Sequence, residues 1–256
     1  MIYCETHGQG PDLVLLHGWG MHSGLWQPVV EHLSPHWRIT TVDLPGHGRS
    51  PLPPGGFDLT RMAALMLDAA PPPARWVGWS LGGLVATRAA LLQPHAVTAL
   101  CLINTLPKFV RGPDWPHAMS PDTLDSFAAN LEQDYALTLQ RFLSLQVRGA
   151  QNERHTLRLI RKLVAARPAA QPEALRLGLA LLRQTDLRPE LKHLRCPIHY
   201  ILGERDTLAP AAAAPALQAL LPRATVTPLP GAGHAPFLSH KDAFFAILND
   251  CLQHTA

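Results

Sequence analysis

The sequence has 256 residues, of which 47% are hydrophobic and 16% are charged, so one large domain can bury its core without metals or disulfides. Its formal net charge is +3, its four cysteines are scattered without a CxxC pair, and no segment approaches the ~18 consecutive apolar residues that span a bilayer. These features exclude a zinc ribbon, a disulfide scaffold and a membrane-spanning protein, and we expect a cytoplasmic monomer without metal, cofactor, nucleic-acid partner or membrane contact.

Six short apolar runs predict buried strands, and amphipathic segments that predict helices lie between several of them. The predicted strands are 13–16, 37–42, 75–77, 99–103, 198–202 and 224–229. The clearest helices between them are 59–70 and 84–92. Strands that alternate with helices predict an α/β fold with a mostly parallel, doubly wound sheet.

The alternation stops between residues 107 and 191, where no strand-like run occurs. Leucine, isoleucine and phenylalanine recur there with helical spacing, in segments 123–131, 136–147, 153–166 and 172–184. The sequence therefore predicts a core, residues 1–106 and 192–256, and a helical lid insertion, residues 107–191. The lid is expected over the carboxyl ends of the strands, where ligands bind in open α/β folds.

The segment Gly78-Trp-Ser-Leu-Gly82 matches the pattern G-x-S-x-G and lies between a predicted strand and a predicted helix. This context is typical of a nucleophile elbow, a sharp turn that exposes a serine hydroxyl at the start of a helix. Glycines suit the flanking positions because a Cβ atom would crowd the strand and the helix. Ser80 is therefore the candidate nucleophile, and a glycine-rich turn with an incidental serine is the alternative.

A serine nucleophile needs a histidine base and a carboxylate that orients it, and in this fold both follow the serine along the chain. Asp206 lies just after a predicted strand, and His234 lies in the loop after the next strand. Glu204 is the competing acid, but its place nearer the strand end favours a structural role. Asp43 precedes the serine and is better suited to fixing a loop.

The loop His17-Gly-Trp-Gly20 follows the first predicted strand. Backbone amides near such a strand end can point at a developing oxyanion. We assign one oxyanion-hole donor to the Trp19 N–H and the other to the N–H of Leu81, the residue after the nucleophile. The side chain of His17 is expected to hold the loop rather than to take part in the chemistry.

Positive charge is concentrated in the predicted lid. Between residues 141 and 183 there are nine Arg or Lys residues and two acidic ones, so this stretch carries a net charge of +7 and the remainder −4. Such asymmetry predicts either an acidic partner that docks on this region or a basic helix face that is only solvated.

Several of these segments together resemble the pimeloyl-[acyl-carrier protein] methyl ester esterases, the BioH carboxylesterases of biotin synthesis. The segments are 17–20, 43–50, 78–83, the loop around Asp206, and 233–240, and in the insertion 114–116 and 141–146. The elbow and the triad alone would specify only the α/β-hydrolase superfamily. The resemblance implies an α/β-hydrolase fold with a helical lid. It also implies hydrolysis of the methyl ester of a pimeloyl chain on acyl carrier protein, by a Ser-His-Asp acyl-enzyme mechanism.

An aliphatic substrate of this kind needs an apolar channel. The candidate lining residues are Trp19, Trp79, Leu81 and Phe142. The alternative is that Trp79 and Phe142 are ordinary core aromatics.

The resemblance also implies that acyl carrier protein, an acidic partner, docks on the lid through three arginines, Arg141, Arg154 and Arg158. A further arginine that the family would place one turn before Arg141 is replaced here by Leu137. This departure predicts either a weaker interface or compensation by other lid cations, Arg161 or Lys162.

Two other functions remain open. A broad carboxylesterase or thioesterase acting on free short-chain esters would use the same triad, because the triad does not distinguish these acyl groups. A non-catalytic binding protein on a hydrolase shell is less consistent with an intact Ser80, Asp206 and His234. Haloalkane dehalogenase chemistry would need a carboxylate at position 80.

Overall fold

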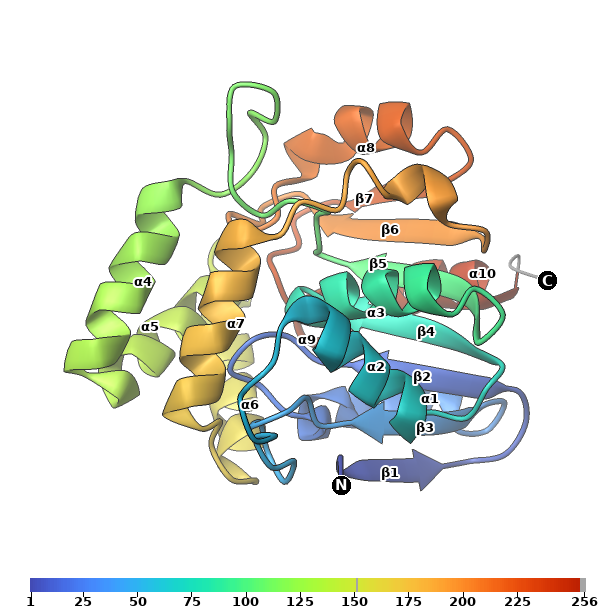
Figure 1. Cartoon of the computed structure of the whole chain (residues 1–256), viewed down its shortest axis with the longest axis horizontal. Helices are drawn as coiled ribbons and strands as arrows, with labels where there is room; N and C mark the ends of the chain where they lie inside the picture. Colours follow the sequence, from blue (N-terminus) through green and yellow to red (C-terminus); the bar gives the residue numbers. More distant parts are fainter. Residues whose placement is uncertain (151, 254–256) are drawn as a thin grey trace.

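A sheet with the strand order β1-β3-β2-β4-β5-β6-β7 forms the centre of the molecule (Figure 1). The computed structural model describes residues 1–150 and 152–253. Strand β1 is antiparallel to β3, and the other neighbouring strands are parallel. The strands are β1 (Cys4–His7), β2 (Asp12–Leu16), β3 (Arg38–Val42), β4 (Ala74–Trp79), β5 (Val97–Ile103), β6 (Ile198–Gly203) and β7 (Thr225–Leu229).

The six predicted strands are all present, and the predicted mostly parallel α/β fold is confirmed. The sequence did not predict β1, whose residues Cys-Glu-Thr-His contain no apolar run and are only partly buried. This edge strand forms because it can pair with β3, from Cys4 opposite Val42 to His7 opposite Ile39. Pairing with a distant segment leaves no periodic pattern in a strand this short.

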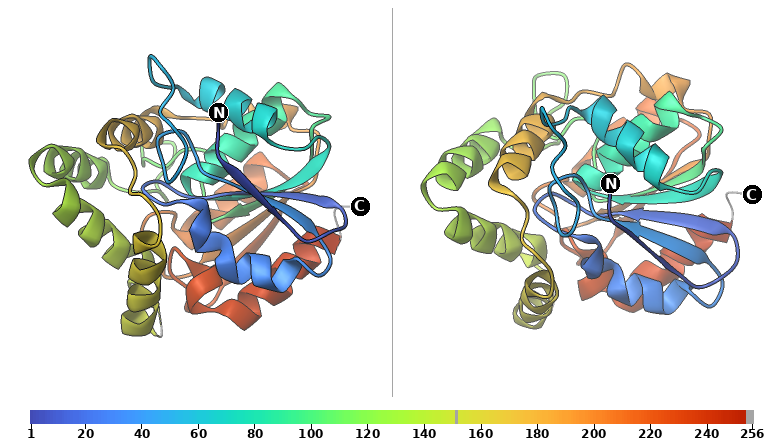
Figure 2. Two further views of the ribbon diagram at one scale, coloured as in Figure 1. Left: turned by 90° about the horizontal axis from the view of Figure 1, so that it is seen from below. Right: turned by 60° about the horizontal axis from the view of Figure 1, so that its bottom comes forward.

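Helices cover both faces of the sheet (Figure 2). Helices α2 (Leu59–Ala69) and α3 (Leu81–Leu92) cover one face, and α1 (Gln27–Leu33) and α10 (Lys241–Gln253) cover the other. Helix α3 begins three residues earlier than predicted, directly after Ser80. The shorter elements are α8 (Ala214–Leu220), α9 (Pro236–Ser239) and the 3₁₀ turns η1 (Ser23–Trp26), η2 (Leu191–His193) and η3 (Ala211–Ala213).

Four α-helices lie between β5 and β6 in the described part of the chain, and Figure 1 shows them grouped beside the carboxyl ends of the parallel strands. They overlap the four predicted segments and are α4 (Pro121–Gln133), α5 (Tyr135–Val147), α6 (Glu153–Ala165) and α7 (Pro172–Gln184). Helices α4 and α7 begin with proline, which lacks an N–H that would be unpaired there anyway. Among the described residues, none of the helices combines the length and the apolar character needed to cross a bilayer.

Two arginines connect this helical insertion to the rest of the molecule. Arg167, just after α6, pairs with Glu5 of β1 and donates to Ser23 Oγ at 2.7 Å. Arg88 of α3 pairs with Glu190, 2.6 Å away, just before η2. Both arginine side chains are largely buried, at 16% and 18% exposed, so these pairs are better shielded from water than surface ion pairs.

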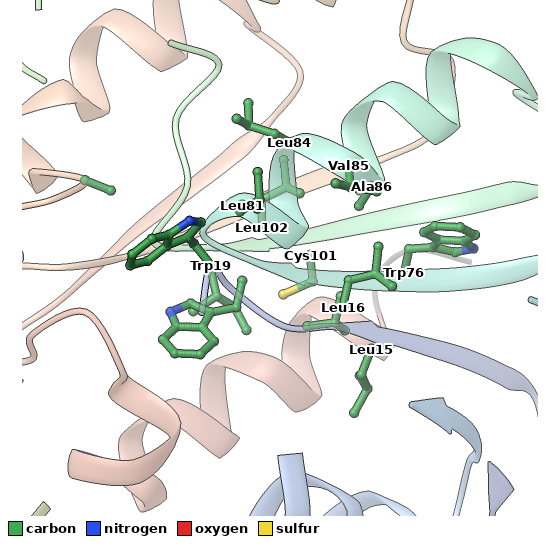
Figure 3. Packing of buried hydrophobic residues seen from close by; sticks show 14 of the residues in the cluster. Leu15, Leu16, Trp19, Trp76, Leu81, Leu84, Val85, Ala86, Cys101 and Leu102 are labelled. Carbon is green, nitrogen blue, oxygen red and sulfur yellow. The ribbon is translucent and has the colours of Figure 1, made fainter. Parts of the chain in front are cut away.

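The core between the sheet and α3 is close-packed. Figure 3 shows Leu81 and Val85 of α3 near Leu16 of β2 and Leu102 of β5, and all four side chains are fully buried. The helix can approach the sheet because Gly82 has no side chain: a Cβ atom there would lie 2.4 Å from the carbonyl oxygen of Leu16. The backbone contact therefore fixes where the helix starts relative to β2.

Replacing Gly82 with alanine should push α3 away from β2. The added methyl group would lie 2.4 Å from Leu16 O and 2.5 Å from His17 O. We expect the free energy of unfolding to fall by about 1–3 kcal/mol, and Tm to fall by roughly 2–4 °C per kcal/mol in thermal unfolding followed by circular dichroism. Gly112→Ala is the control, because its nearest neighbour is the movable Asp114 side chain at 3.3 Å. Equal losses in both variants would contradict the prediction.

Candidate active site

Ser80 lies at the turn between β4 and α3 with a positive φ, at φ 55° and ψ −120°. Such a conformation is strained for a residue with a Cβ atom and needs support from its surroundings. The Ser80 N–H donates to Ile103 O at 3.0 Å, and the Ser80 carbonyl accepts from Thr105 Oγ1 at 2.8 Å. A Cβ on Gly78 would lie 2.6 Å from Gly82 O, so the turn depends on the glycines that the sequence pattern supplied.

His234 and Asp206 form a buried pair. Nδ1 of His234 lies 2.6 Å from Oδ2 of Asp206, and the other carboxylate oxygen accepts from the backbone N–H of Leu208 at 2.7 Å and of Ala209 at 3.1 Å. A carboxylate on Nδ1 holds the proton there, which leaves Nε2 as the basic nitrogen. Nε2 is buried and has no hydrogen-bond partner among the described residues.

Glu204, the competing acid, serves a different loop. Its Oε2 accepts the backbone N–H of Gly231 at 2.9 Å, which braces the turn three residues before the histidine. This contact agrees with the structural role expected from its position nearer the strand end. Among the described residues, the carboxylate that contacts the His234 ring belongs to Asp206.

The loop after β2 passes directly beside the nucleophile. A Cβ atom on Gly18 would lie 3.2 Å from the Cβ of Ser80. Within the part of the chain that the structure describes, neither the Trp19 N–H nor the Leu81 N–H has a hydrogen-bond partner. Free N–H groups are what an oxyanion hole requires, and the assignment of these two as the donors stays a prediction.

His17 holds this loop, as expected. Its Nε2 accepts the backbone N–H of Leu44 at 2.9 Å, so the proton is on Nδ1, which donates to Gly18 O at 2.8 Å. Burial, followed by the nearby His47, lowers the pKa of His17 to about 3. Asp43 also fixes loops, because its carboxylate accepts the backbone N–H groups of Ser23 at 2.7 Å and Arg49 at 2.8 Å.

A narrow apolar cavity of about 10 Å³ lies against Ser80. Apart from the serine, its lining is hydrophobic and comes mainly from the helical insertion: Phe109, Met119, Leu124, Phe127, Phe142, Leu179, Leu182 and Leu208. This volume has room for about one water molecule.

Of the four predicted channel residues, the cavity lining includes Phe142 but not Trp19, Trp79 or Leu81. The Trp19 ring packs edge-on against Phe142 at 4.7 Å, and its Nε1 donates to Leu175 O at 2.8 Å. Trp19 thus supports the cavity wall from behind.

Trp79 points toward the core. Its ring packs against Trp26 and Phe237, and its Nε1 donates to the carbonyl oxygen of His234 at 2.7 Å. Trp79 therefore packs as a core aromatic, which was the alternative interpretation. In addition, it forms a hydrogen bond to the backbone of the candidate base, His234. Leu81 is also fully buried, at the start of α3.

The arginines predicted to contact a carrier protein lie on the surface of the insertion. Arg141 of α5 and Arg154 and Arg158 of α6 are exposed and form no ion pair with the described residues. Arg154 and Arg158 border one shallow hollow. Leu137, one turn before Arg141, is 40% exposed, so the position of the missing arginine also faces solvent.

Sequence reasoning missed Asn104, which follows β5. Its side chain is fully buried and bonds to both loops that carry the acid and the base. Its backbone is left-handed, with φ 44°. An asparagine after a strand is common in turns, so no local pattern marked it.

These observations define a class of protein, the α/β hydrolases, in which Ser80 at the turn into α3 is the candidate nucleophile and the bonded pair of His234 and Asp206 is the candidate base and acid. The Alpha/beta hydrolase family profile matches residues 13–247. The solved structure of the esterase EaEST from Exiguobacterium antarcticum superimposes with a TM-score of 0.88 over 97% of this chain and 94% of that one. At 23% identity, that similarity shows a shared fold.

Relatives at higher identity narrow the class. A protein of Xanthomonas oryzae pv. oryzae is 46% identical over 94% of both chains, and one of Nitrosomonas europaea is 46% identical over 95% of this chain and 96% of its own. A protein of Aliivibrio salmonicida is 40% identical over 98% of this chain and 96% of its own. All three are named pimeloyl-[acyl-carrier protein] methyl ester esterase, and this chain belongs to that family.

Acidification should destabilise the protein through His17 and His47. Burial is the main reason that their pKa values fall to about 3 and about 4, whereas an unfolded histidine has a pKa of about 6.5. Below about pH 6.5 the unfolded chain therefore binds protons that the folded protein excludes. Stability should fall as pH falls, by up to about 1.4 kcal/mol per pH unit for each histidine until pH about 4.

Urea unfolding at several pH values between about 7 and 4.5 would measure this slope. His47→Gln should remove about half of it, because glutamine does not titrate and its amide can still donate to Pro45 O, the partner of His47 Nδ1. An unchanged slope in the variant would show that other groups cause the acid sensitivity.

Proposed function

We propose that the protein is a serine carboxylesterase that hydrolyses the methyl ester of pimeloyl-acyl carrier protein, a step of biotin synthesis. The observation that carries the proposal is the 2.6 Å contact between His234 Nδ1 and Asp206 Oδ2, in a chain 46% identical to relatives with that name. Nε2 has no hydrogen-bond partner among the described residues, Ser80 Oγ included, so it is free to accept the serine proton once the two side chains come within hydrogen-bond reach.

In the proposed mechanism, His234 Nε2 accepts the hydroxyl proton of Ser80 as the serine oxygen attacks the ester carbonyl. The backbone N–H groups of Trp19 and Leu81 stabilise the charge that develops on the carbonyl oxygen. His234 then protonates the departing methanol, and a water activated by the same histidine hydrolyses the acyl-enzyme. Asp206 keeps the proton on Nδ1 and stabilises the imidazolium that forms in each step.

The apolar cavity supports an aliphatic acyl chain as the substrate. Its lining carries no charged side chain, and Phe142 borders it directly. The volume of about 10 Å³ is too small for a pimeloyl chain, so helices of the insertion must shift to admit one. We therefore propose that residues 107–191 act as a lid on a core formed by residues 1–106 and 192–256.

A broad carboxylesterase or thioesterase is the alternative within the same class, because a hydrophobic cavity accepts many acyl groups. Comparing kcat/KM for a pimeloyl-carrier methyl ester with that for a free aryl acetate separates the two. A non-catalytic binding protein would be indicated if a fluorophosphonate probe failed to label Ser80.

Ser80→Ala and His234→Ala should each lower ester hydrolysis by about 10⁴–10⁶-fold, because the members of a triad act as a unit. Asp206→Asn should lower it by about 10⁴-fold, since the amide favours the wrong tautomer of the histidine. Mass spectrometry of a pimeloyl-carrier methyl ester would follow loss of the methyl group, and circular dichroism would check the fold. Near-normal turnover by either alanine variant contradicts the assignment, and activity retained only in Asp206→Asn would point to Glu204.

The exposed basic face of the insertion supports docking of an acidic carrier protein. Arg154 and Arg158 are four residues apart on α6, so they share one face of the helix, and Arg161 continues it. Three other cations of this stretch are committed to acids within the chain: Arg167 to Glu5, Arg176 to Glu173 and Arg183 to Asp125. We propose that Arg141, Arg154 and Arg158 are the carrier contacts.

Reversing the charge of both Arg154 and Arg158 to Glu should lower kcat/KM for the carrier-bound ester at least about tenfold, because an acidic partner is then repelled. Hydrolysis of a free aryl acetate should be unchanged, and added salt should weaken only the first reaction. The double variant Arg195→Glu with Arg223→Glu is the matched control. These exposed cations lie just before the amino ends of β6 and β7, whereas the insertion lies beside the carboxyl ends of the strands. Equal effects of the two double variants would refute docking on α6.

A further inference from the structure

The side chain of Asn104, at the end of β5, bonds to the two segments that carry the candidate acid and the candidate base. Oδ1 accepts the backbone N–H of Gly203, at the end of β6, at 2.6 Å. Nδ2 donates to the carbonyl oxygen of Gly233, the residue before His234, at 2.9 Å. These partners assign the orientation of the Asn104 amide, because its oxygen must face the N–H of Gly203 and its nitrogen must face the carbonyl of Gly233. Both polar ends of a fully buried side chain are thus satisfied.

The side-chain oxygen of Asn104 replaces a backbone carbonyl in the hydrogen-bond ladder between β5 and β6. Strands β5 and β6 pair in parallel as far as Ile103 and Ile201, and the Asn104 N–H still donates to Ile201 O at 2.9 Å. In a continuing parallel ladder, the N–H of Gly203 would donate next to the backbone carbonyl of residue 104. The backbone turns away there, at φ 44°, and Oδ1 of the same residue accepts this bond instead.

The amide nitrogen of Asn104 connects the end of β5 to the loop that carries His234. Gly203 must be glycine, because a Cβ would lie 2.3 Å from Gly233 O, the carbonyl that Asn104 binds. The next carbonyl, that of His234, accepts from Trp79 Nε1 at 2.7 Å. The N–H that follows, of Ala235, donates to Gln146 O in α5 at 3.2 Å. The peptide groups around the base are therefore held from the elbow, from β5 and from the insertion.

We propose that Asn104 is a positioning residue for the triad, which sets the distance between the acid loop after β6 and the histidine loop after β7. The inference rests on the proposed role of His234 as the base. Asp206 lies only three residues after Gly203, and His234 directly follows Gly233. One side-chain amide therefore bonds to the start of the acid loop and to the residue before the histidine. If it is lost, Nε2 of the histidine moves relative to Ser80, and a displacement of about 1 Å can lower the rate about 10²-fold.

A purely structural role would give a different outcome, namely lower stability with normal chemistry in the molecules that remain folded. Two substitutions separate the possibilities. Asn104→Gly keeps the left-handed backbone without strain and removes both side-chain bonds. Asn104→Asp has the same shape and keeps the acceptor for Gly203 N–H, but it loses the donor to Gly233 O.

Kinetics with a free aryl acetate test the proposal, because any working triad hydrolyses it whatever the natural acyl group is. Both variants should lower kcat about 10–100-fold and change KM less than about threefold, since the substrate cavity is untouched. Ser50→Ala is the matched control. Ser50 is also a buried polar residue whose side chain makes two bonds to the backbone, to Tyr3 N–H and Asp43 O, and neither partner belongs to the loops after β6 and β7. It should lower Tm without lowering kcat.

Proton NMR gives a readout that does not depend on turnover. The short Nδ1–H···Oδ2 bond between His234 and Asp206 should give a low-field resonance that is kept in Ser50→Ala and shifted or broadened in Asn104→Gly. If Asn104→Asp and Asn104→Gly keep wild-type kcat and the resonance is unchanged, the positioning role is refuted. An inactive wild-type protein would refute the proposed function, and the resonance would still decide the role of Asn104.

Discussion

The close contact between α3 and β2 is the constraint on which the rest of the site depends. Backbone carbonyls of Leu16 and His17 lie where a side chain on Gly82 would have to be. With the helix start held there, the chain must turn sharply at Ser80 and adopt a positive φ. The same geometry leaves the first helical N–H, of Leu81, without a partner among the described residues and brings Gly18 beside the serine. The candidate nucleophile and both candidate oxyanion donors therefore lie next to one backbone contact.

Two buried histidines, His17 and His234, have different bonding partners, which suit them to different roles. Both ring nitrogens of His17 bond to backbone groups, and burial keeps the ring neutral, so it can only hold a loop. His234 has a carboxylate on one nitrogen and no partner for the other among the described residues. A carboxylate stabilises the imidazolium that a base becomes when it accepts a proton, whereas backbone carbonyl and amide groups cannot do so to the same degree.

The helical insertion has two chemically different surfaces. Its inner side supplies hydrophobic residues such as Phe127 and Phe142 to the cavity above Ser80. Its outer side carries arginines of α5 and α6 that have no acidic partner among the described residues. Arg167 attaches the insertion to β1 at one end of α6. An apolar interior with a charged exterior suits a long acyl group delivered by a protein, because the chain and its carrier need opposite environments.

The sequence by itself determined the features that depend on neighbours along the chain. Alternating apolar runs specified six strands, glycines around Ser80 specified the elbow, and the order of serine, acid and base specified Asp206 and His234 as candidates. Only the tertiary structure decided which way Trp79 points, that β1 joins the sheet, and that Asn104 bridges the loops after β6 and β7. These features depend on partners 32 to 155 residues away, because a side-chain direction, a strand pairing or a left-handed turn is set by the group that it meets in space.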